Sequence, residues 1–415
     1  MKYILLVGDG MADHPHPGLG GKTPLQAAHT PNMDRLAQHG TVGTAHTLVQ
    51  GYPLGSDVAN LSLLGYDPVA YYSGRAPLEA ANIGVDLAPA DVAFRLNLVS
   101  VKDGIMADYS SGHIPTEDAK PLIKMLGERL GTKKISFHLG TSYRHLLVWR
   151  SGPLEARCTP PHDFSDRPVA DHLPRGPRHK ELIQVMEDSR LLLEGHEVNR
   201  ERRRDNQPPA NMIWLWGQGK KPEMPTLTHK YQLTGAVISA VDLVKGIGIY
   251  AGLQVVNVPG ATGYLDTNYV GKAEAALKVL KKHDFVFVHV EAPDETGHNG
   301  DVAGKVQAIE DFDAKVVGTI LAGLEGRDDY RVLVLPDHPT PLDVRTHVDE
   351  PVPFVLYQPG RPPSGLAGYD EAQARATGRH VEQGWRLMDV LIRDVWPEAP
   401  AAGQARDAES GGEGG

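Results

Sequence analysis

Short apolar runs alternate with amphipathic stretches along most of this chain, which is typical of proteins built from parallel strands and helices. The first run, Tyr3–Val7, ends in a Gly-Asp-Gly turn and predicts a strand that is buried on both faces. Further along, Thr30 suits a helix N-cap, Pro31 suits the first helical position, and Gly40 suits the stop. The chain is therefore expected to begin as strand, loop and helix.

The C-terminal half repeats this alternation. Residues 273–281 predict a helix, residues 284–291 a strand, and residues 331–335 and 353–357 two further strands. Apolar residues recur every three or four positions over 302–324, which predicts one long amphipathic helix. This pattern predicts an α/β fold in which helices sandwich a mostly parallel sheet.

A middle region of different composition interrupts the α/β pattern. Residues 72–222 are rich in Arg, Pro and His, and their strand-like pieces are separated by proline-dense loops. We expect them to form a smaller α+β domain inserted into a discontinuous core domain of residues 1–71 and 223–398. Residues 399–415 are small and polar, and we expect them to form a flexible tail because they cannot bury enough surface to order themselves.

Composition narrows the classes of partner. The 415 residues carry a formal net charge of −10, which argues against the basic stripes of nucleic-acid binders but leaves room for a local pocket that takes an anionic substrate. The first apolar run is too short for a signal peptide or a membrane span. The single cysteine, Cys158, allows no intrachain disulfide. We therefore expect a cytoplasmic protein without nucleic-acid or membrane partners, and the oligomeric state stays open.

Ligand-type side chains follow three of the predicted strands at the point where each strand ends. They are Asp9 after the first strand, Asp294 and His298 after the second, and Asp337, His338 and His347 after the third. Sites in open α/β sheets form outside the carboxyl ends of the strands, so these side chains are expected to meet at one edge. Asp and His bind ions such as Zn²⁺ and Mn²⁺, and six ligands suit two ions that share a site.

The segment GYPLGSDVAN, residues 51–60, places Ser56 in a glycine-rich turn. Metals beside this serine would stabilise its alkoxide and make it a nucleophile for phosphoryl transfer. Each of these residues, taken alone, also fits an ordinary turn, cap or loop role, and only their shared position favours a joint site. A second glycine-rich segment, residues 18–23, lacks the glycine spacing of a phosphate-binding loop and is interpreted as a plain loop.

Seven segments resemble the archaeal-type cofactor-independent phosphoglycerate mutases of the alkaline phosphatase superfamily. They are GDGMAD, GGKTPLQAAHTPNMDRLA, GSDVANLSLLGYDP, GRAPLEAANIGV, VEAPDETGH, PDH and THVDEPVPF, within a resemblance over about residues 1–395. The resemblance implies an alkaline-phosphatase-like fold, a serine that becomes phosphorylated and an inserted domain that closes over a small phosphorylated carboxylate substrate. It also implies two divalent ions, manganese first with magnesium, zinc or cobalt as alternatives, and no requirement for 2,3-bisphosphoglycerate.

The resemblance also assigns roles to residues of this chain. It makes Ser56 the phosphorylated nucleophile and Lys245 the lysine that steadies the transferred phosphoryl group. The metal ligands that it implies form two sets, Asp9, Ser56, Asp337 and His338 for one ion and Asp294, His298 and His347 for the other. The inserted domain offers planar Arg forks and other groups that suit phosphate or carboxylate. These candidates for substrate binding are Arg75, Arg95, His113, Arg144, His145, His162 and Asp163.

The implied function is an isomerase of glycolysis and gluconeogenesis that interconverts 3-phosphoglycerate and 2-phosphoglycerate. The segments SDVANLS, MADYSSGHI and SYRHLLVWR depart from the archaeal pattern, and a bacterial branch with such variants is proposed to phosphorylate homoserine from ATP. A metal-dependent phosphatase or phosphonate-processing enzyme is a third alternative, although a closing domain that excludes water argues against plain hydrolysis. A non-catalytic binding protein is a fourth, and the complete ligand set argues against it.

Overall fold

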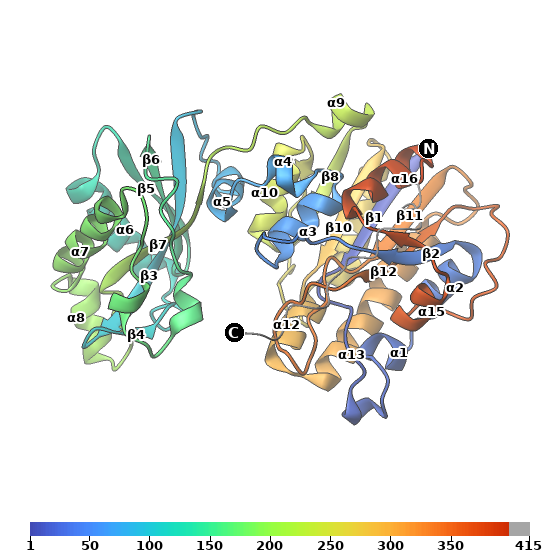
Figure 1. Cartoon of the computed structure of the whole chain (residues 1–415), viewed down its shortest axis with the longest axis horizontal. Helices are drawn as coiled ribbons and strands as arrows, with labels where there is room; N and C mark the ends of the chain where they lie inside the picture. The colour runs from blue at the N-terminus through green and yellow to red at the C-terminus, as the bar shows by residue number, and fades with distance from the viewer. Residues whose placement is uncertain (398–415) are drawn as a thin grey trace, which may run out of the picture.

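The computed structural model describes residues 1–397 and contains two separate β-sheets (Figure 1). The larger sheet has eight strands in the order β13-β2-β12-β11-β1-β10-β8-β9. These are β1 Lys2–Gly8, β2 Thr41–Ala45, β8 Gly235–Ile238, β9 Gln254–Val255, β10 Phe285–Val290, β11 Tyr330–Leu335, β12 Val352–Tyr357 and β13 His380–Val381. Within the described residues β12 alone runs against its neighbours in this sheet, so the expected mostly parallel sheet is confirmed. The expected tail at 399–415 lies outside the described residues.

Successive residues of the strands point to opposite faces of the larger sheet, and helices cover both faces. Ile4 and Leu6 of β1 pack on one face, while Leu5 and Val7 pack on the other. The elements with side chains in the first core are α1 Pro24–Ala27, α2 Pro31–His39, α11 Tyr269–Leu280, α12 Ala292–Asn299, α13 Val302–Asp311, α14 Gly318–Gly323 and α15 Glu371–Ala376. Those in the second core are α3 Ser56–Leu63, α4 Pro68–Tyr71, α5 Arg75–Asn82, α9 Leu227–Tyr231, α10 Asp242–Tyr250 and α16 Leu387–Arg393.

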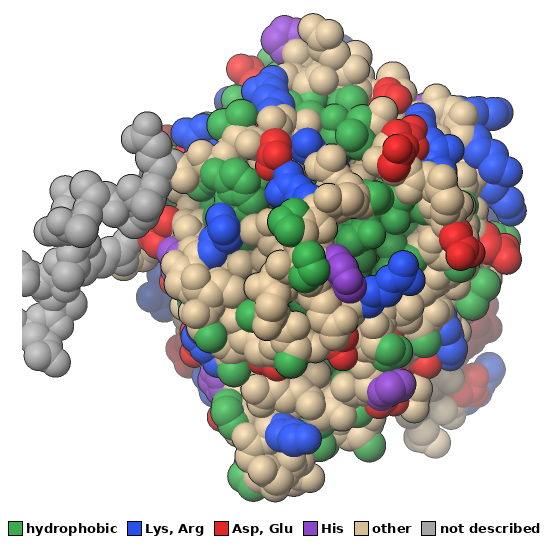
Figure 2. Space-filling model, turned by 90° about the vertical axis from the view of Figure 1, so that its right-hand side faces the viewer, with side chains coloured by type: hydrophobic (Ala, Val, Ile, Leu, Met, Phe, Trp, Pro, Cys, Tyr) green, Lys and Arg blue, Asp and Glu red, His purple; other side chains and the backbone are tan. Residues whose placement is uncertain are grey.

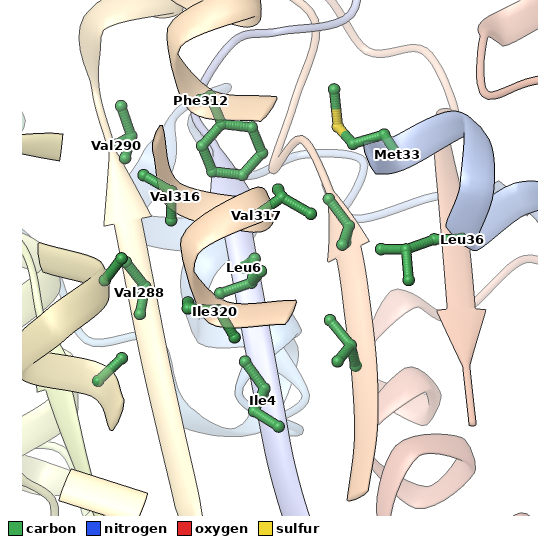
Figure 3. Close-up of a cluster of buried hydrophobic side chains, with 14 of the residues drawn as sticks. Ile4, Leu6, Met33, Leu36, Val288, Val290, Phe312, Val316, Val317 and Ile320 are labelled. Atoms are coloured by element: carbon green, nitrogen blue, oxygen red, sulfur yellow. The ribbon is translucent and has the colours of Figure 1, made fainter. Parts of the chain in front are cut away.

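The long helix expected over 302–324 contains a π-helical segment, Phe312–Val317, between α13 and α14. Phe312 from this segment is fully buried and points into the core beside β1 and β10 (Figure 3). The next residue, Asp313, accepts hydrogen bonds from the backbone N–H groups of Asn32 (3.2 Å) and Met33 (2.7 Å) at the start of α2. Asp313 therefore caps α2, whereas the expected cap Thr30 makes no side-chain capping hydrogen bond.

The smaller sheet is antiparallel and lies within the stretch expected to be an inserted domain. It runs in the order β4-β3-β6-β5, and β7 also pairs with β3. Its strands are β3 Asp91–Lys102, β4 Ile105–Asp108, β5 Ile135–Thr141, β6 Arg144–Arg150 and β7 Met212–Gly219. Three helices pack on it around Phe94 and Trp214, namely α6 Thr116–Leu130, α7 His179–Leu193 and α8 Glu197–Arg204. The boundaries at 71/72 and 222/223 stay a prediction.

Helix α5, Arg75–Asn82, lies between the two sheets (Figure 1). It packs against α10 beside the larger sheet and against β3 and β7 of the smaller one. Next to α5, the two chain segments that connect the sheets touch each other. Ser73 Oγ of one segment donates a hydrogen bond to the carbonyl of Lys220 in the other, at 2.7 Å. A side chain at Gly219 would collide with the carbonyl group of Ser73, so only glycine permits this close crossing. This crossing marks the place where the chain passes from the larger sheet to the smaller sheet and back.

The surface carries charged side chains of both signs. On the face shown in Figure 2, Lys and Arg side chains are interspersed with Asp and Glu. None of the helices within residues 1–397 combines the length and apolar character that crossing a membrane requires.

The core beside β1 predicts a specific stability effect. Phe312→Ala should lower the free energy of unfolding by about 3–5 kcal/mol, because it leaves a cavity under the larger sheet. Val270→Ala is the matched control, since Val270 lies on the neighbouring helix α11 but is 42% exposed, and it should change the free energy by less than about 0.5 kcal/mol. Urea unfolding followed by circular dichroism measures both, and equal losses would contradict this packing.

Candidate metal centre

Three adjacent strands of the larger sheet deliver acidic side chains to the same edge. In the order β11-β1-β10, β1 is followed by Asp9, β10 leads into α12 with Asp294, and β11 is followed by Asp337. The side chains of all three are almost entirely removed from solvent, at 1%, 6% and 0% exposed. The edge therefore concentrates negative charge in a place where water cannot screen it.

Ser56 lies at the first position of α3, in the first group of expected ligands, which also contains Asp9, Asp337 and His338. Its Oγ is 3.1 Å from His338 Nε2 and 3.4 Å from Asp9 Oδ2. One helical turn later, the side-chain amide of Asn60 donates to the carbonyl of Ser56 at 2.9 Å and to Asp337 Oδ2 at 2.7 Å. Asn60 thus ties the serine to the acidic cluster, and the sequence reasoning did not single it out.

The second group of ligands surrounds Asp294. His298 follows it by one turn of α12, and its Nε2 is 3.2 Å from Asp294 Oδ2. His347 approaches from the loop after β11, with Nε2 3.4 Å from Asp294 Oδ1 and 3.0 Å from His298 Nε2. Three ligand atoms at such separations have the spacing of donors around one ion, because donors about 2.1 Å from an ion and at right angles stand about 3 Å apart.

Thr340 connects the two groups. Its hydroxyl donates to Asp294 Oδ1 and lies 3.3 Å from His338 Nδ1. Since Asp294 belongs to the second group and His338 to the first, this buried hydroxyl orients one ligand of each.

The charges of the cluster shift the pKa values of its members. Burial raises the pKa of Asp9 well above its usual range, and the carboxylates of Asp337 and Asp294 raise it further. For Asp294, burial acts in the same direction, but hydrogen bonds from His298 and His347, together with the charges of His338 and His347, hold the pKa well below its usual value. The same hydrogen bond to Asp294 raises the pKa of His298 to about 9. Divalent cations would relieve the repulsion between these carboxylates, and the donor set fits them.

His289 is a member of the cluster that sequence reasoning missed. It lies on β10 with its ring fully buried, and its Nε2 is 3.0 Å from Asp9 Oδ2. Burial lowers the pKa of His289 to about 4, so the ring is neutral near pH 7. The sequence feature that could have revealed His289 is its position as a lone histidine among the valines and phenylalanines of a buried strand, two residues before Glu291.

The residues expected to bind substrate lie in several environments. Arg75 pairs with Asp57 at 3.1 Å, and its guanidinium borders Gly55, next to Ser56. On the smaller sheet, the remaining candidates apart from His145 line a strip of aromatic rings. They are Arg95 over Trp216, His162 at the edge of Trp216, Arg144 over Tyr143, His113 at the edge of Tyr143, and Asp163 beside His162.

Two of the candidate residues make contacts outside the aromatic strip. His145 is buried, 2% exposed, and its Nδ1 accepts a hydrogen bond from Gly140 N at 3.1 Å. Lys245 lies on α10, which packs against α3, and its ammonium pairs with Asp242 of the same helix at 3.7 Å. The structure thus groups all seven expected metal ligands, including Ser56, while the roles of the other residues stay predictions.

Comparison with known proteins gives consistent matches. A family model described as 2,3-bisphosphoglycerate-independent phosphoglycerate mutase matches residues 37–199. A protein of Geobacter sulfurreducens named as a probable enzyme of this kind is 54% identical over 397 residues, which covers 94% of this chain and 100% of that protein. A protein of Methanosarcina barkeri named 2,3-bisphosphoglycerate-independent phosphoglycerate mutase is 51% identical over 396 residues, which covers 95% of this chain and 100% of that protein.

Solved structures agree with the sequence matches. The cofactor-independent phosphoglycerate mutase of Thermoplasma acidophilum superimposes with a TM-score of 0.64 at 30% identity, over 95% of this chain and 99% of that one. A protein of Pyrococcus horikoshii superimposes with a TM-score of 0.81 at 29% identity, over 96% and 100%.

His145 generates a pH prediction. Burial lowers its pKa to about 3, whereas an unfolded histidine titrates near 6.5. As the pH falls below about 6.5, the unfolded chain binds a proton that the folded chain does not, so this position lowers stability by about 1.4 kcal/mol per pH unit. His145→Asn removes that titration.

The free-energy gap between wild type and His145→Asn should therefore shrink by about 2 kcal/mol between pH 6.5 and pH 5. Denaturant unfolding followed by tryptophan fluorescence at both pH values measures the gap. A gap that stays constant or widens on acidification would contradict the burial of a neutral ring.

Proposed function

This chain belongs to the 2,3-bisphosphoglycerate-independent phosphoglycerate mutase family, and from that membership we propose that it interconverts 3-phosphoglycerate and 2-phosphoglycerate. The reaction is an intramolecular phosphoryl transfer that passes through a phosphoserine at Ser56. Its substrate is a small phosphorylated carboxylate, and 2,3-bisphosphoglycerate is not required. As an isomerase of glycolysis and gluconeogenesis, the enzyme would work in the cytoplasm.

One observation carries the proposal, namely the position of the Ser56 hydroxyl. It lies within 3.4 Å of both Asp9 and His338 at the first position of a helix. A serine in an ordinary turn needs no such neighbours, whereas a nucleophile needs groups that favour its alkoxide. The amide of Asn60 holds the backbone of this serine against Asp337, so the hydroxyl is presented in a fixed place.

The two ligand groups fit two divalent ions. Asp9, Ser56, Asp337 and His338 would hold one, and Asp294, His298 and His347 would hold the other. The buried Oδ1 of Asp9 has no hydrogen-bond partner among the described residues, which fits an oxygen that binds a cation. When bound, such ions neutralise the carboxylates, lower the pKa of the serine hydroxyl and stabilise the charge of the phosphoryl group. From the family resemblance we propose Mn²⁺ first, with Zn²⁺, Co²⁺ or Mg²⁺ as alternatives, and mixed nitrogen and oxygen ligands are compatible with divalent ions of this kind.

Ser56 Oγ attacks the phosphorus atom, so the Oγ–P bond forms and the bond from phosphorus to the glycerate oxygen breaks, while the serine hydroxyl loses its proton and the leaving glycerate oxygen takes one up. The glycerate then turns within the site. Its other hydroxyl loses a proton and bonds to phosphorus, the Oγ–P bond breaks, and Ser56 Oγ regains a proton. Arg75 is the side chain best placed to bind the phosphoryl oxygens, since Asp57 holds its guanidinium beside Gly55. Lys245 is proposed to steady the same group from α10.

The smaller sheet is proposed to bind the glycerate and exclude water. Burial raises the pKa values of Glu291 and Glu295 at the start of α12 overall, although the charge of Arg144 on β6 lowers both. Arg95 and His162 lie along the aromatic strip beside it. Closure of this sheet over the substrate would keep water from the phosphoserine, and a mutase needs that exclusion to avoid acting as a phosphatase.

Ser56→Ala provides the first test of function. With Mn²⁺ and 3-phosphoglycerate, wild type should form 2-phosphoglycerate in an assay coupled to enolase, and Ser56→Ala should lower kcat by about 10⁴-fold or more, because the nucleophile is lost. Ser136→Ala, at an exposed position of β5, is the matched control and should keep wild-type activity. A parallel mixture of ATP and homoserine separates the rival function. Phosphohomoserine alone, or free phosphate alone, would overturn the proposal.

Removal of metal provides the second test. Chelation with EDTA should abolish mutase activity, and Mn²⁺ should restore it in wild type but not in Asp294→Asn, because that variant lacks the carboxylate shared by His298 and His347. Metal content is measured on the same samples by mass spectrometry. A chelated, metal-free enzyme with full activity would be incompatible with the proposed chemistry.

A further inference from the structure

His289 occupies a place in the cluster that neither proposed ion uses. Its ring is 0% exposed, and its two nitrogens point to different partners. Nδ1 lies 3.3 Å from Ser239 Oγ, and Nε2 lies 3.0 Å from Asp9 Oδ2. Although it is this close to a carboxylate, Nε2 makes no hydrogen bond of acceptable geometry to any described residue. A buried ring nitrogen is thus aimed at a buried carboxylate without a proper hydrogen bond between them.

A cation fits this arrangement better than a hydrogen bond does. A nitrogen and an oxygen that bind one ion at about 2.1 Å and at right angles stand about 3 Å apart, which is the separation of His289 Nε2 and Asp9 Oδ2. Asp337 supplies a third ligand atom, because one atom from each of Asp9, His289 and Asp337 all lie within 4.8 Å of one another. Two carboxylates and one imidazole form a donor set for a divalent transition-metal ion.

The His289 position differs from that of the ion beside Ser56. Asp9 turns Oδ1 toward His338 Nε2, at 3.4 Å, whereas its Oδ2 lies 3.0 Å from His289 Nε2 and 3.4 Å from Ser56 Oγ. In the described part of the chain, no group of ligand atoms within 4.8 Å of one another contains both His289 and His338. Nitrogens on opposite sides of a single ion would be at most about 4.2 Å apart, twice the usual bond length. The two histidines therefore bracket Asp9 from different sides.

We propose that His289, Asp9 and Asp337 form a third cation position, which shares Asp9 and Asp337 with the ion beside Ser56. Ser239 sets the tautomer of His289, since its Oγ accepts from Nδ1–H and leaves the Nε2 lone pair for the metal. Ser239 is itself fixed, because its Oγ also accepts the backbone N–H of Val241 at 3.0 Å. The third cation holds the Asp9 carboxylate in the orientation that Ser56 requires. This inference rests on the proposed function only for the presence of the other two ions, beside Ser56 and Asp294.

Counting bound metal tests the third position. Metal-free chain is equilibrated with excess Mn²⁺, passed through a desalting column and analysed by elemental mass spectrometry, and the affinities are measured by titration calorimetry. Wild type should retain three equivalents, and His289→Asn should retain two. His39→Asn, which replaces an exposed histidine at the end of α2, should still retain three. Circular dichroism of each metal-free variant checks that it folds.

Ser239→Ala keeps the test sharp even where His289→Asn does not fold. It preserves the imidazole but removes the group that orients it, so the affinity for the third equivalent should fall about tenfold or more while the first two are unchanged.

Two equivalents in wild type, or three in His289→Asn, would overturn the third position. A drop from two in wild type to one in His289→Asn would also overturn it, because His289 would then belong to one of the two proposed ions. Wild type with no bound metal would instead remove the proposed two-ion chemistry as well.

Discussion

The repulsion between three buried carboxylates governs the structure of this site. Asp9, Asp294 and Asp337 are brought together by neighbouring parallel strands and are almost fully removed from water. Holding like charges in such a place lowers the stability of the folded chain strongly unless cations neutralise them. Burial raises the pKa of Asp9 well above its usual range, and the charges of Asp337 and Asp294 raise it further. Site and fold are therefore linked, since the same strand order that builds the core also creates the need for metal.

The nucleophile is linked to the smaller sheet by a short chain of contacts. Asp57, next to Ser56, is fully buried and accepts hydrogen bonds from the side chains of Tyr72, at 2.5 Å, and Arg75, at 3.1 Å. Burial alone would raise the pKa of Asp57, but the charge of Arg75 and the hydrogen bonds from Tyr72 and Arg75 together lower it. Arg75 begins α5, the helix that packs against both sheets. These contacts connect the smaller sheet to Asp57, which is the residue next to Ser56.

Most of the fold and much of the site could be predicted from the sequence, because both depend on local patterns. Apolar runs gave the buried strands, and polar residues at their ends gave Asp9, Asp294 and Asp337 before any spatial information was available. The π-helical segment at Phe312–Val317 could not be predicted, since the apolar residues there recur at the three- or four-residue spacing that also fits an α-helix. The capping of α2 by Asp313 is equally invisible, because it joins residues 280 positions apart.

The residues missed at the site are those whose role depends on tertiary neighbours. Asn60 and Thr340 carry no motif of their own, and only their contacts with Asp337 and Asp294 reveal them. His289 was hidden inside an apolar strand, where a histidine is more often a packed core residue than a ligand. The burial of His145 could not be predicted either, because the sequence does not distinguish a buried ring from one that lines a site, and its expected role in substrate binding stays a prediction.

A crystal structure of the chain grown with Mn²⁺, with diffraction data collected at the manganese absorption edge, tests the convergence of these groups most directly. We expect anomalous density between Ser56 Oγ, Asp9, Asp337 and His338, and a second peak between Asp294, His298 and His347. Manganese bound elsewhere, with Ser56 beyond coordinating distance of any ion, would contradict a serine nucleophile that works at a metal centre.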